Sequence, residues 1–313
     1  MTIGDVPIQF PLGNTDELAS PCLDEISDAL SRDGFLALNA ITNADEVAYI
    51  RAILSGFFAN QVGADEGSMF DTLASNPGEQ NGRSIQMTNP TEYAPELRRT
   101  QFVRNATKIA HQVLSSDAML IFDLALLKPA FIGKGTPWHQ DEAYREPGFI
   151  HDELTFWMPL QNVGRDDGCM VFIPGSHHRG LLEHRCVNND PRAHALECCD
   201  IFPEAEAVDR PLPAGGCTIH NSRTLHCTRD NISRVDRYAY ILVFGVPPKR
   251  APESRAMGWI EQRNNAHRKT KRAWLLRGGV FTLIKRKWQR GELRGAAMIR
   301  YSLAKGIRML LGR

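Results

Sequence analysis

A histidine and an aspartate stand one residue apart in the stretch GTPWHQDEAY, residues 135–144. Side chains two residues apart on an extended segment point to the same face, so His139 and Asp141 could reach one metal ion together. A mononuclear non-haem iron site uses two imidazoles and one carboxylate on one face of the metal and leaves the other positions open. The pair alone also fits a surface turn, and a metal site requires a second, distant histidine.

Several histidines follow the pair and could supply the second imidazole: His151, His177, His178, His184, His194, His220 and His226. The stretch RTLHCTRDNISRVDRYAYILVF, residues 223–244, favours His226, which ends a short extended run before the turn-like RDNIS. Arg237 then opens the most apolar strand of the chain. If these two strands pair as antiparallel neighbours, His226 and Arg237 point into one cavity. A buried guanidinium there requires a carboxylate, ideally bound through two parallel hydrogen bonds, and a co-substrate with a free carboxylate would provide it.

The secondary-structure elements that must position these residues are predicted to be mainly helices in the N-terminal part and strands after it. Apolar spacing predicts helices over residues 22–35 and 44–58, with a glycine stop near residue 34 and Thr42 or Asn43 as the cap of the second helix. The other N-terminal predictions are a short strand over 35–41, a polar loop over 61–92 and a further helix over 94–116.

Short runs rich in β-branched and aromatic residues replace the helical pattern from about residue 118. These runs cover residues 119–129, 153–163, 168–176, 215–221 and 237–246. Glycine, proline, asparagine and aspartate separate them, which is typical of an antiparallel sandwich or barrel and not of alternating β-α units. Helices followed by strands predict an α+β fold in a single domain.

The composition is that of an ordinary globular chain, with 42% hydrophobic and 23% charged residues among 313. The seven cysteines form no C-x-x-C pair, which argues against a disulfide framework and predicts a reducing, cytoplasmic location. The N-terminal stretch lacks the basic and apolar regions of a signal peptide. No run reaches 18 uncharged apolar residues, so no membrane span is expected.

Three motifs occur together in a fixed order. They are WHQD at residues 138–141, WMPLQNVGRDDGCMVFIPGSHHRG at 157–180, and H-x-T-x-x-N-x-S-x-x-x-R from His226 to Arg237. Together they resemble the phytanoyl-CoA dioxygenase family over roughly residues 22–247. The resemblance implies an oxygenase that depends on Fe(II), 2-oxoglutarate and O2, built on a double-stranded β-helix (a jelly-roll or cupin-like barrel) with the N-terminal helices packed on it.

The resemblance also assigns residues. It implies iron ligation by His139, Asp141 and His226, and it places the distal carboxylate of 2-oxoglutarate on Arg237. It implies that three further residues line or contact the co-substrate: Thr228, Lys128 and Trp157. Each of these three has a structural alternative, since a lysine at a strand end is usually solvated, a threonine can stabilise a turn, and a tryptophan is often part of the core.

The carboxylate of Asp141 bears on the type of reaction. Related halogenating oxygenases have a small residue in its place, so its presence favours hydroxylation or another hydrogen-abstraction outcome, such as desaturation or cyclisation. The expected substrate is a small organic metabolite, lipophilic or acyl-linked. Two other classes of protein remain open: a non-catalytic barrel that senses a metal or small ligand, and a zinc hydrolase, which would have no need for Arg237.

The C-terminal segment, residues 251–313, is set apart by charge. It carries sixteen Lys and Arg against three Asp and Glu, whereas residues 1–250 carry 21 against 33. We therefore expect an oxygenase domain over 1–250 and a basic helical extension over 251–313. The spacing in 295–311 predicts an amphipathic helix, which either contacts an anionic membrane surface or packs on the acidic domain. Neither nucleic-acid binding nor an obligate protein partner is expected.

Overall fold

The computed structural model describes residues 20–65, 67–75 and 83–263. Three α-helices belong to the N-terminal part: α1 (Ser20–Asp33), α2 (Ala44–Ala59) and α3 (Gln101–Val113). The side chain of Asn43 caps α2 by accepting a hydrogen bond from the Glu46 N–H, and Thr100 caps α3 in the same way through the Val103 N–H. Both caps satisfy backbone donors that have no partner within a helix.

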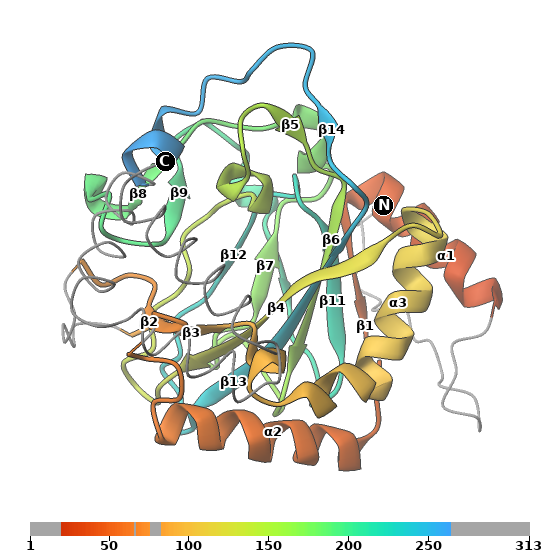
Figure 1. Cartoon of the computed structure of the whole chain (residues 1–313), viewed down its shortest axis with the longest axis vertical. Coiled ribbons are helices and arrows are strands. Elements are labelled where there is room, and N and C mark those ends of the chain that lie inside the picture. Colours follow the sequence, from red (N-terminus) through yellow and green to blue (C-terminus); the bar gives the residue numbers. More distant parts are fainter. Residues whose placement is uncertain (1–19, 66, 76–82, 264–313) are drawn as a thin grey trace, which may run out of the picture.

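Two antiparallel sheets form the centre of the molecule (Figure 1). The larger sheet has the strand order β1 (Phe35–Leu38), β11 (Cys217–Asn221), β6 (Glu153–Pro159), β13 (Arg237–Gly245), β4 (Met119–Lys128), β3 (Ile85–Thr88) and β2 (Met69–Asp71). The smaller sheet has the order β10 (Val208–Arg210), β7 (Met170–Phe172) and β12 (His226–Thr228).

The remaining elements are short. Two further strand pairs join β5 (Phe149–Ile150) to β14 (Lys249–Arg250) and β8 (His184–Cys186) to β9 (Leu196–Cys198). Single 3₁₀ turns occupy η1 (Pro90–Glu92), η2 (Pro95–Arg99), η3 (Asp141–Tyr144), η4 (Ser176–Arg179), η5 (Val187–Asn189) and η6 (Glu204–Glu206).

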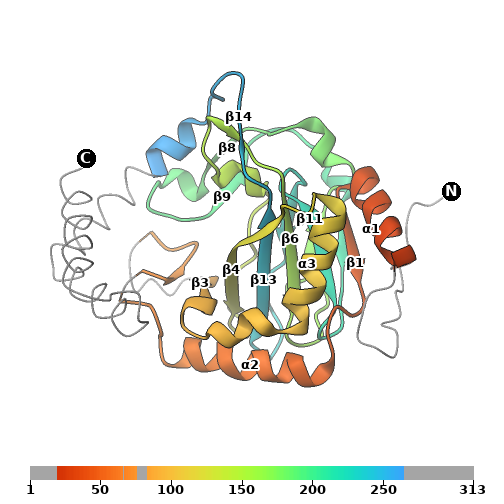
Figure 2. The same cartoon turned by 45° about the vertical axis from the view of Figure 1, so that its right-hand side comes forward.

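The period-two alternation of each strand gives the larger sheet two different faces. On β13, Tyr240, Leu242 and Phe244 belong to the core beneath the helices, and Figure 2 shows α3 crossing this face. The residues between them, Ala239, Ile241 and Val243, belong to a second core shared with the smaller sheet. Phe35 of β1 stacks on Phe172 of β7 across this second core, with ring centroids 4.4 Å apart.

Most of the expected elements are present, and helices packed on antiparallel sheets are confirmed as the architecture. The arrangement is consistent with a jelly roll. The prediction of a loop over 61–92 was wrong in part, because β2 and β3 form a hairpin there that extends the larger sheet. The expected pairing of the strands of His226 and Arg237 was also wrong, because β12 pairs with β7 in the smaller sheet while β13 lies between β4 and β6 in the larger one.

The segment after residue 250 begins on the body of the domain. Ala251 donates its N–H to the Gly148 carbonyl, and Met257, Trp259 and Ile260 join a buried cluster with Ala143 and Leu196. The domain boundary at residue 250 stays a prediction, and the amphipathic segment 295–311 lies outside the described residues. In the part of the chain that the structure describes, no helix is long and apolar enough to cross a bilayer, and the cytoplasmic location stays a prediction.

Gly34 and Gly56 offer a matched pair for testing the packing at the end of α1. Gly34 has φ +81°, and a Cβ there would lie 2.6 Å from the Thr224 hydroxyl, whereas a Cβ at Gly56 within α2 meets no atom within 4 Å. We expect Gly34→Ala to lower the free energy of unfolding by about 1–2 kcal/mol or more, because a left-handed alanine is strained. Gly56→Ala should raise it by about 0.5–1 kcal/mol. Urea denaturation measures both, and equal effects of the two changes would contradict the packing described.

Candidate iron centre and co-substrate pocket

The two candidate imidazole ligands lie directly opposite each other in an isolated antiparallel bridge. His139 and His226 exchange both backbone hydrogen bonds, with N···O distances of 2.9 and 3.0 Å. Opposed residues of an antiparallel pair present their side chains on the same face. Their ring centroids accordingly lie 4.2 Å apart, although residues 140–225 separate them in the sequence.

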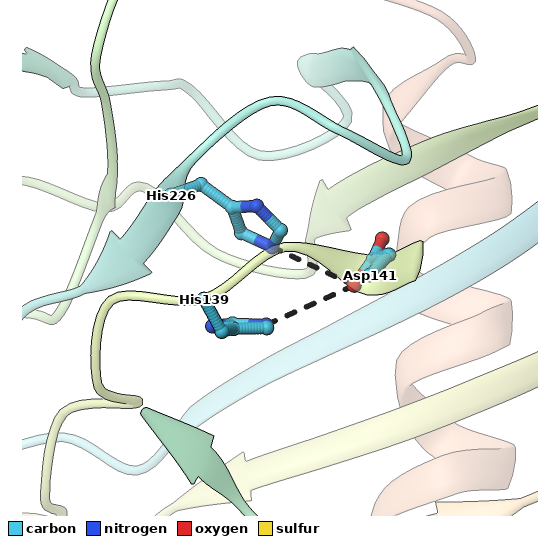
Figure 3. Close-up of side chains that lie close together, drawn as sticks. All are labelled: His139, Asp141 and His226. Atoms are coloured by element: carbon cyan, nitrogen blue, oxygen red, sulfur yellow. Dashed lines mark ion pairs between the residues drawn. The ribbon is translucent and has the colours of Figure 1, made fainter. Parts of the chain in front are cut away.

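Asp141 completes the group that the spacing predicted. One ligand atom from each of His139, Asp141 and His226 lies within 4.8 Å of the others. Asp141 Oδ1 is 3.8 Å from Nε2 of His139 and 3.7 Å from Nε2 of His226, and Figure 3 shows the three side chains converging. The two imidazoles and one carboxylate are the donor set of a facial iron site.

Both histidines are held in the tautomer that metal binding requires. Nδ1 of His139 lies 2.7 Å from the Pro137 carbonyl, and Nδ1 of His226 lies 2.8 Å from the Thr224 carbonyl. A carbonyl only accepts, so each Nδ1 carries the hydrogen and each Nε2 keeps a lone pair directed at the shared point. Burial lowers the pKa of His139 and lowers that of His226 further, and so favours the neutral form of both rings.

The carboxylate of Asp141 is oriented by its second oxygen. Oδ2 accepts a hydrogen bond of 2.6 Å from the Thr155 hydroxyl and lies 3.3 Å from Nε2 of His220. Burial alone would raise the pKa of Asp141, but the nearby imidazoles of His226, His220 and His139 bring it well below its usual value. The group is therefore ionised, with Oδ1 free for a metal.

Gln140, the residue between His139 and Asp141, anchors this segment through hydrogen bonds. The Gln140 side chain is buried and donates to the carbonyls of Gly180 and Arg223, while its oxygen accepts from the Leu182 N–H. The Gln140 N–H donates to Nε2 of His184 at 3.1 Å. These four hydrogen bonds fix the backbone between His139 and Asp141, so the two candidate ligands would need little reorganisation to bind a metal.

A cavity of about 330 Å³ opens on the three side chains. Strands β4 and β13 contribute an apolar wall, the β2–β3 region contributes neutral polar groups, and two arginines lie on its lining. The lining residues used below are Phe122, Leu124, Tyr144, Arg145, Trp157 and Arg263. Pockets of this size with an apolar wall and a few polar groups are typical of small-molecule sites.

Arg237 is buried beside this cavity without a partner for its charge. It is 1% exposed, and none of its three guanidinium nitrogens has a hydrogen-bond partner in the described part of the chain. Its guanidinium carbon lies 5.4 Å from the ring centroid of Trp157, which lines the cavity. Burial lowers the pKa of Arg237 to about 9. An unpaired buried guanidinium is costly, and a carboxylate ligand would satisfy it.

Lys128 is Arg237's register partner on β4 and is also buried, so its solvated alternative does not hold. Its ammonium donates to the Thr228 hydroxyl at 2.6 Å and to the Arg229 carbonyl at 2.7 Å. Burial, and then the charge of Arg237, lower the pKa of Lys128 well below its usual value. Thr228 and Trp157 both line the cavity. Lys128 is hydrogen-bonded to Thr228 and Arg237 lies over Trp157, so the four residues that the resemblance assigns to the co-substrate lie together.

The sequence assigned no role to Thr155, and it offered His220 only as one of several candidates from which His226 was favoured. Both lie on neighbouring strands, β6 and β11, where they are register partners. Their sequence signal is the alternation of each strand, because a polar residue falls there on the face opposite the helical core. The register that places them beside Asp141 is a long-range property that the two local patterns do not contain.

Comparisons with known proteins agree with this geometry. The family model described as phytanoyl-CoA dioxygenase matches residues 30–239. A probable alpha-ketoglutarate-dependent hypophosphite dioxygenase of Stutzerimonas stutzeri is 24% identical over 65% of this chain and 72% of its own. The ectoine dioxygenase of Streptomyces avermitilis is 27% identical over 76% and 84%. The crystal structure of EvdO2 from Micromonospora carbonacea var. aurantiaca, complexed with 2-oxoglutarate, superposes with TM-score 0.65 at 27% identity, over 75% of this chain and 96% of that one.

The fold and the relatives define the class, that of the 2-oxoglutarate-dependent non-haem iron dioxygenases, as the motifs predicted. The chain belongs to the phytanoyl-CoA dioxygenase family, whose model covers two thirds of its length.

The hydroxyl that orients Asp141 gives a test of the metal centre. Thr155→Val keeps the shape of the side chain but removes the donor to Asp141 Oδ2. Loss of such an outer hydrogen bond typically lowers metal affinity by about 10–100-fold, and His226→Ala should lower it further because a ligand is lost. Anaerobic calorimetric titration with Fe(II) measures both changes.

Thr218→Val is the matched control, because Thr218 is a buried threonine on β11 whose hydroxyl has no hydrogen-bond partner among the described residues. We expect wild-type Fe(II) affinity from this variant. Equal affinities of the Thr155 and His226 variants and the wild type would show that the metal binds elsewhere.

Proposed function

We propose that this protein is an Fe(II)- and 2-oxoglutarate-dependent dioxygenase that hydroxylates an unactivated C–H bond of a small organic metabolite. The observation that carries the proposal is the buried guanidinium of Arg237, unpaired among the described residues, beside a cavity that also holds His139, Asp141 and His226. The overall reaction takes the C–H compound, O2 and 2-oxoglutarate to the alcohol, succinate and CO2.

His139, Asp141 and His226 would hold the iron through Nε2, Oδ1 and Nε2. When bound, Fe(II) supplies the redox chemistry that couples oxidative decarboxylation of 2-oxoglutarate to oxidation of the C–H bond. The chain supplies position and charge, because Arg237 binds the distal carboxylate and Thr228 lies beside it with its hydroxyl already accepting from Lys128. The Trp157 ring covers Arg237 and helps to keep water from this ion pair.

Arg237 also separates this proposal from the two other classes. A zinc hydrolase could use the same three ligands, but it would leave a buried cation without a function. A metal-sensing barrel would bind iron without turning over 2-oxoglutarate. The retained carboxylate of Asp141 supports hydroxylation over halogenation, since it occupies the position that a halide would need.

The relatives indicate the range of substrates without defining one. By their names, one acts on hypophosphite and another on ectoine, which are both small and polar. The apolar wall of Phe122, Leu124 and Ile241 in this cavity supports a substrate with an apolar part, in keeping with the lipophilic or acyl-linked metabolite expected from the sequence.

Succinate release tests the reaction itself. We expect the Fe(II)-loaded chain to convert 2-oxoglutarate to succinate in air, and a panel of metabolites to reveal the substrate by hydroxylated product. Asp141→Ala should abolish turnover because the metal loses its carboxylate. Metal binding without succinate formation across the panel would support the sensor class instead.

The co-substrate anchor has a separate prediction. Losing one member of a buried charge pair costs about 2–5 kcal/mol, so Arg237→Met should weaken 2-oxoglutarate binding by about 30-fold or more. Arg237→Lys should recover only part of this loss, because an ammonium cannot form the bidentate fork. Anaerobic titration of the Fe(II) protein with 2-oxoglutarate, followed by absorbance, measures the affinity.

Arg229→Gln is the control for this titration, because Arg229 is paired with Asp209 and does not line the cavity. We expect it to bind 2-oxoglutarate as the wild type does. Unchanged affinity in Arg237→Met would assign that arginine a structural role.

A further inference from the structure

A second buried arginine, Arg263, lines the same cavity. It belongs to the helical residues 258–263, drawn in blue beside β8 and β9 in Figure 1. This segment follows the stretch that matches the family model, residues 30–239. Arg263 is therefore a feature of this chain that the family match does not assign.

Packing of the surrounding segment restrains the position of Arg263. Trp259 donates its indole N–H to the Ala143 carbonyl at 2.9 Å, and Met257 and Ile260 are buried against the same region. The guanidinium carbon of Arg263 lies 4.8 Å from the ring centroid of Tyr144, and Nη1 lies 3.5 Å from the His194 carbonyl. These contacts restrict the position of the guanidinium, whose fork of N–H donors suits a bidentate ligand.

The charge of Arg263 is not neutralised within the described residues. Arg145 also lines the cavity, but it pairs with Glu153 at 2.6 Å. No carboxylate lies within ion-pair distance of Arg263 in the ranges 20–65, 67–75 and 83–263, and its buried Nε has no hydrogen-bond partner there. Burying a charge is costly unless it is paired. Arg263 thus presents an unsatisfied cation to the ligand space.

Tyr144 contacts both Arg263 and the candidate iron centre. Its ring lies under the guanidinium of Arg263 and is perpendicular to the ring of His139, with the two ring centroids 5.9 Å apart. Arg237 is covered by Trp157, a different part of the lining. Of the two arginines on the cavity lining, Arg145 is paired and Arg263 is not, while Arg237 lies behind the lining residue Trp157. Apolar residues such as Phe122 and Leu124 are also on the lining.

We propose that Arg263 binds an oxyanion group of the substrate, and that the substrate is a small molecule with a carboxylate or phosphonate-like end and an apolar body that reaches the iron centre. The position of oxidation rests on the proposed function, whereas anion binding at Arg263 does not. The Arg263 fork fixes one end of the molecule, and the apolar wall guides the other end toward His139, Asp141 and His226.

Anion binding can be measured without turnover. We propose calorimetric titration of the anaerobic full-length protein, loaded with Fe(II) and saturating 2-oxoglutarate so that Arg237 is occupied. The probes are hexanoate, hexylphosphonate and the neutral hexan-1-ol. We expect at least one anion to bind the wild type about tenfold or more tightly than the alcohol, as a desolvated charge pair would give. The better of the two anions identifies the type of oxyanion.

Variants locate the effect. Arg263→Gln should remove the preference for the anion while leaving 2-oxoglutarate affinity unchanged, and Arg263→Lys should retain part of it. Arg250→Gln makes the same change in net charge at an exposed position outside the cavity lining and should keep the full preference.

Three results would overturn the proposal: no anion preference in the wild type, no binding of either anion at millimolar concentration, or a preference that survives in Arg263→Gln. The wild-type comparison of anion with alcohol decides the matter even where a variant fails to fold. Binding of 2-oxoglutarate is recorded first, so its absence identifies a failure of the proposed function alone. The same probes are then titrated into the metal-free chain, where an Arg263-dependent preference would still support the anion site.

Discussion

The backbone bridge between His139 and His226 is the constraint on which the rest of the site depends. Two hydrogen bonds, His139 N–H to the His226 carbonyl and the reverse, place the two residues directly opposite each other as a hydrogen-bonded antiparallel pair. Both rings then point to one side, and Asp141, two residues further on, follows them. Because the Nδ1 atoms are already bonded to the carbonyls of Pro137 and Thr224, backbone geometry fixes the tautomers as well as the positions. The donor set is thus determined largely by main-chain pairing.

The same alternation separates the chemistry from the helical core. Each central strand sends one set of side chains to the helices and the other set to the cavity, as Phe156 and Trp157 do on β6. Polar groups such as Thr155 could therefore appear on the cavity face without disturbing the core behind it. The helices stabilise the larger sheet from one side only, which leaves its other face available for ligands.

Local patterns in the sequence predicted the helices, most strands and the residues that converge as candidate ligands, but not which strands pair. The i, i+2 spacing of His139 and Asp141 is a local property, and the extended backbone of Gln140 between them preserves it although Asp141 begins η3. The strand that pairs with the strand of His226 is distant in sequence, so no local pattern identifies it. Pairing with the strand of Arg237 was the expectation, but the two strands lie in different sheets. The β2–β3 hairpin was missed because its apolar residues are few and lie among glycines and asparagines in a polar stretch. Arg263 was counted only as one of many charges in a basic segment.

Three arginines on or beside the cavity show why burial and pairing indicate a ligand site better than a count of charges does. Arg145, Arg237 and Arg263 have the same formal charge, yet Glu153 neutralises the first, while the other two have no carboxylate within ion-pair distance in the described residues. A folded chain tolerates an unpaired buried cation only where surrounding packing holds it or a ligand satisfies it. Arg237 occupies a position that the family match covers, and we have proposed the co-substrate as its partner. Arg263 lies beyond the family match, so a ligand that satisfies it would be specific to this chain. Substrate choice would then come from the segment after residue 250, and the reaction from the two sheets.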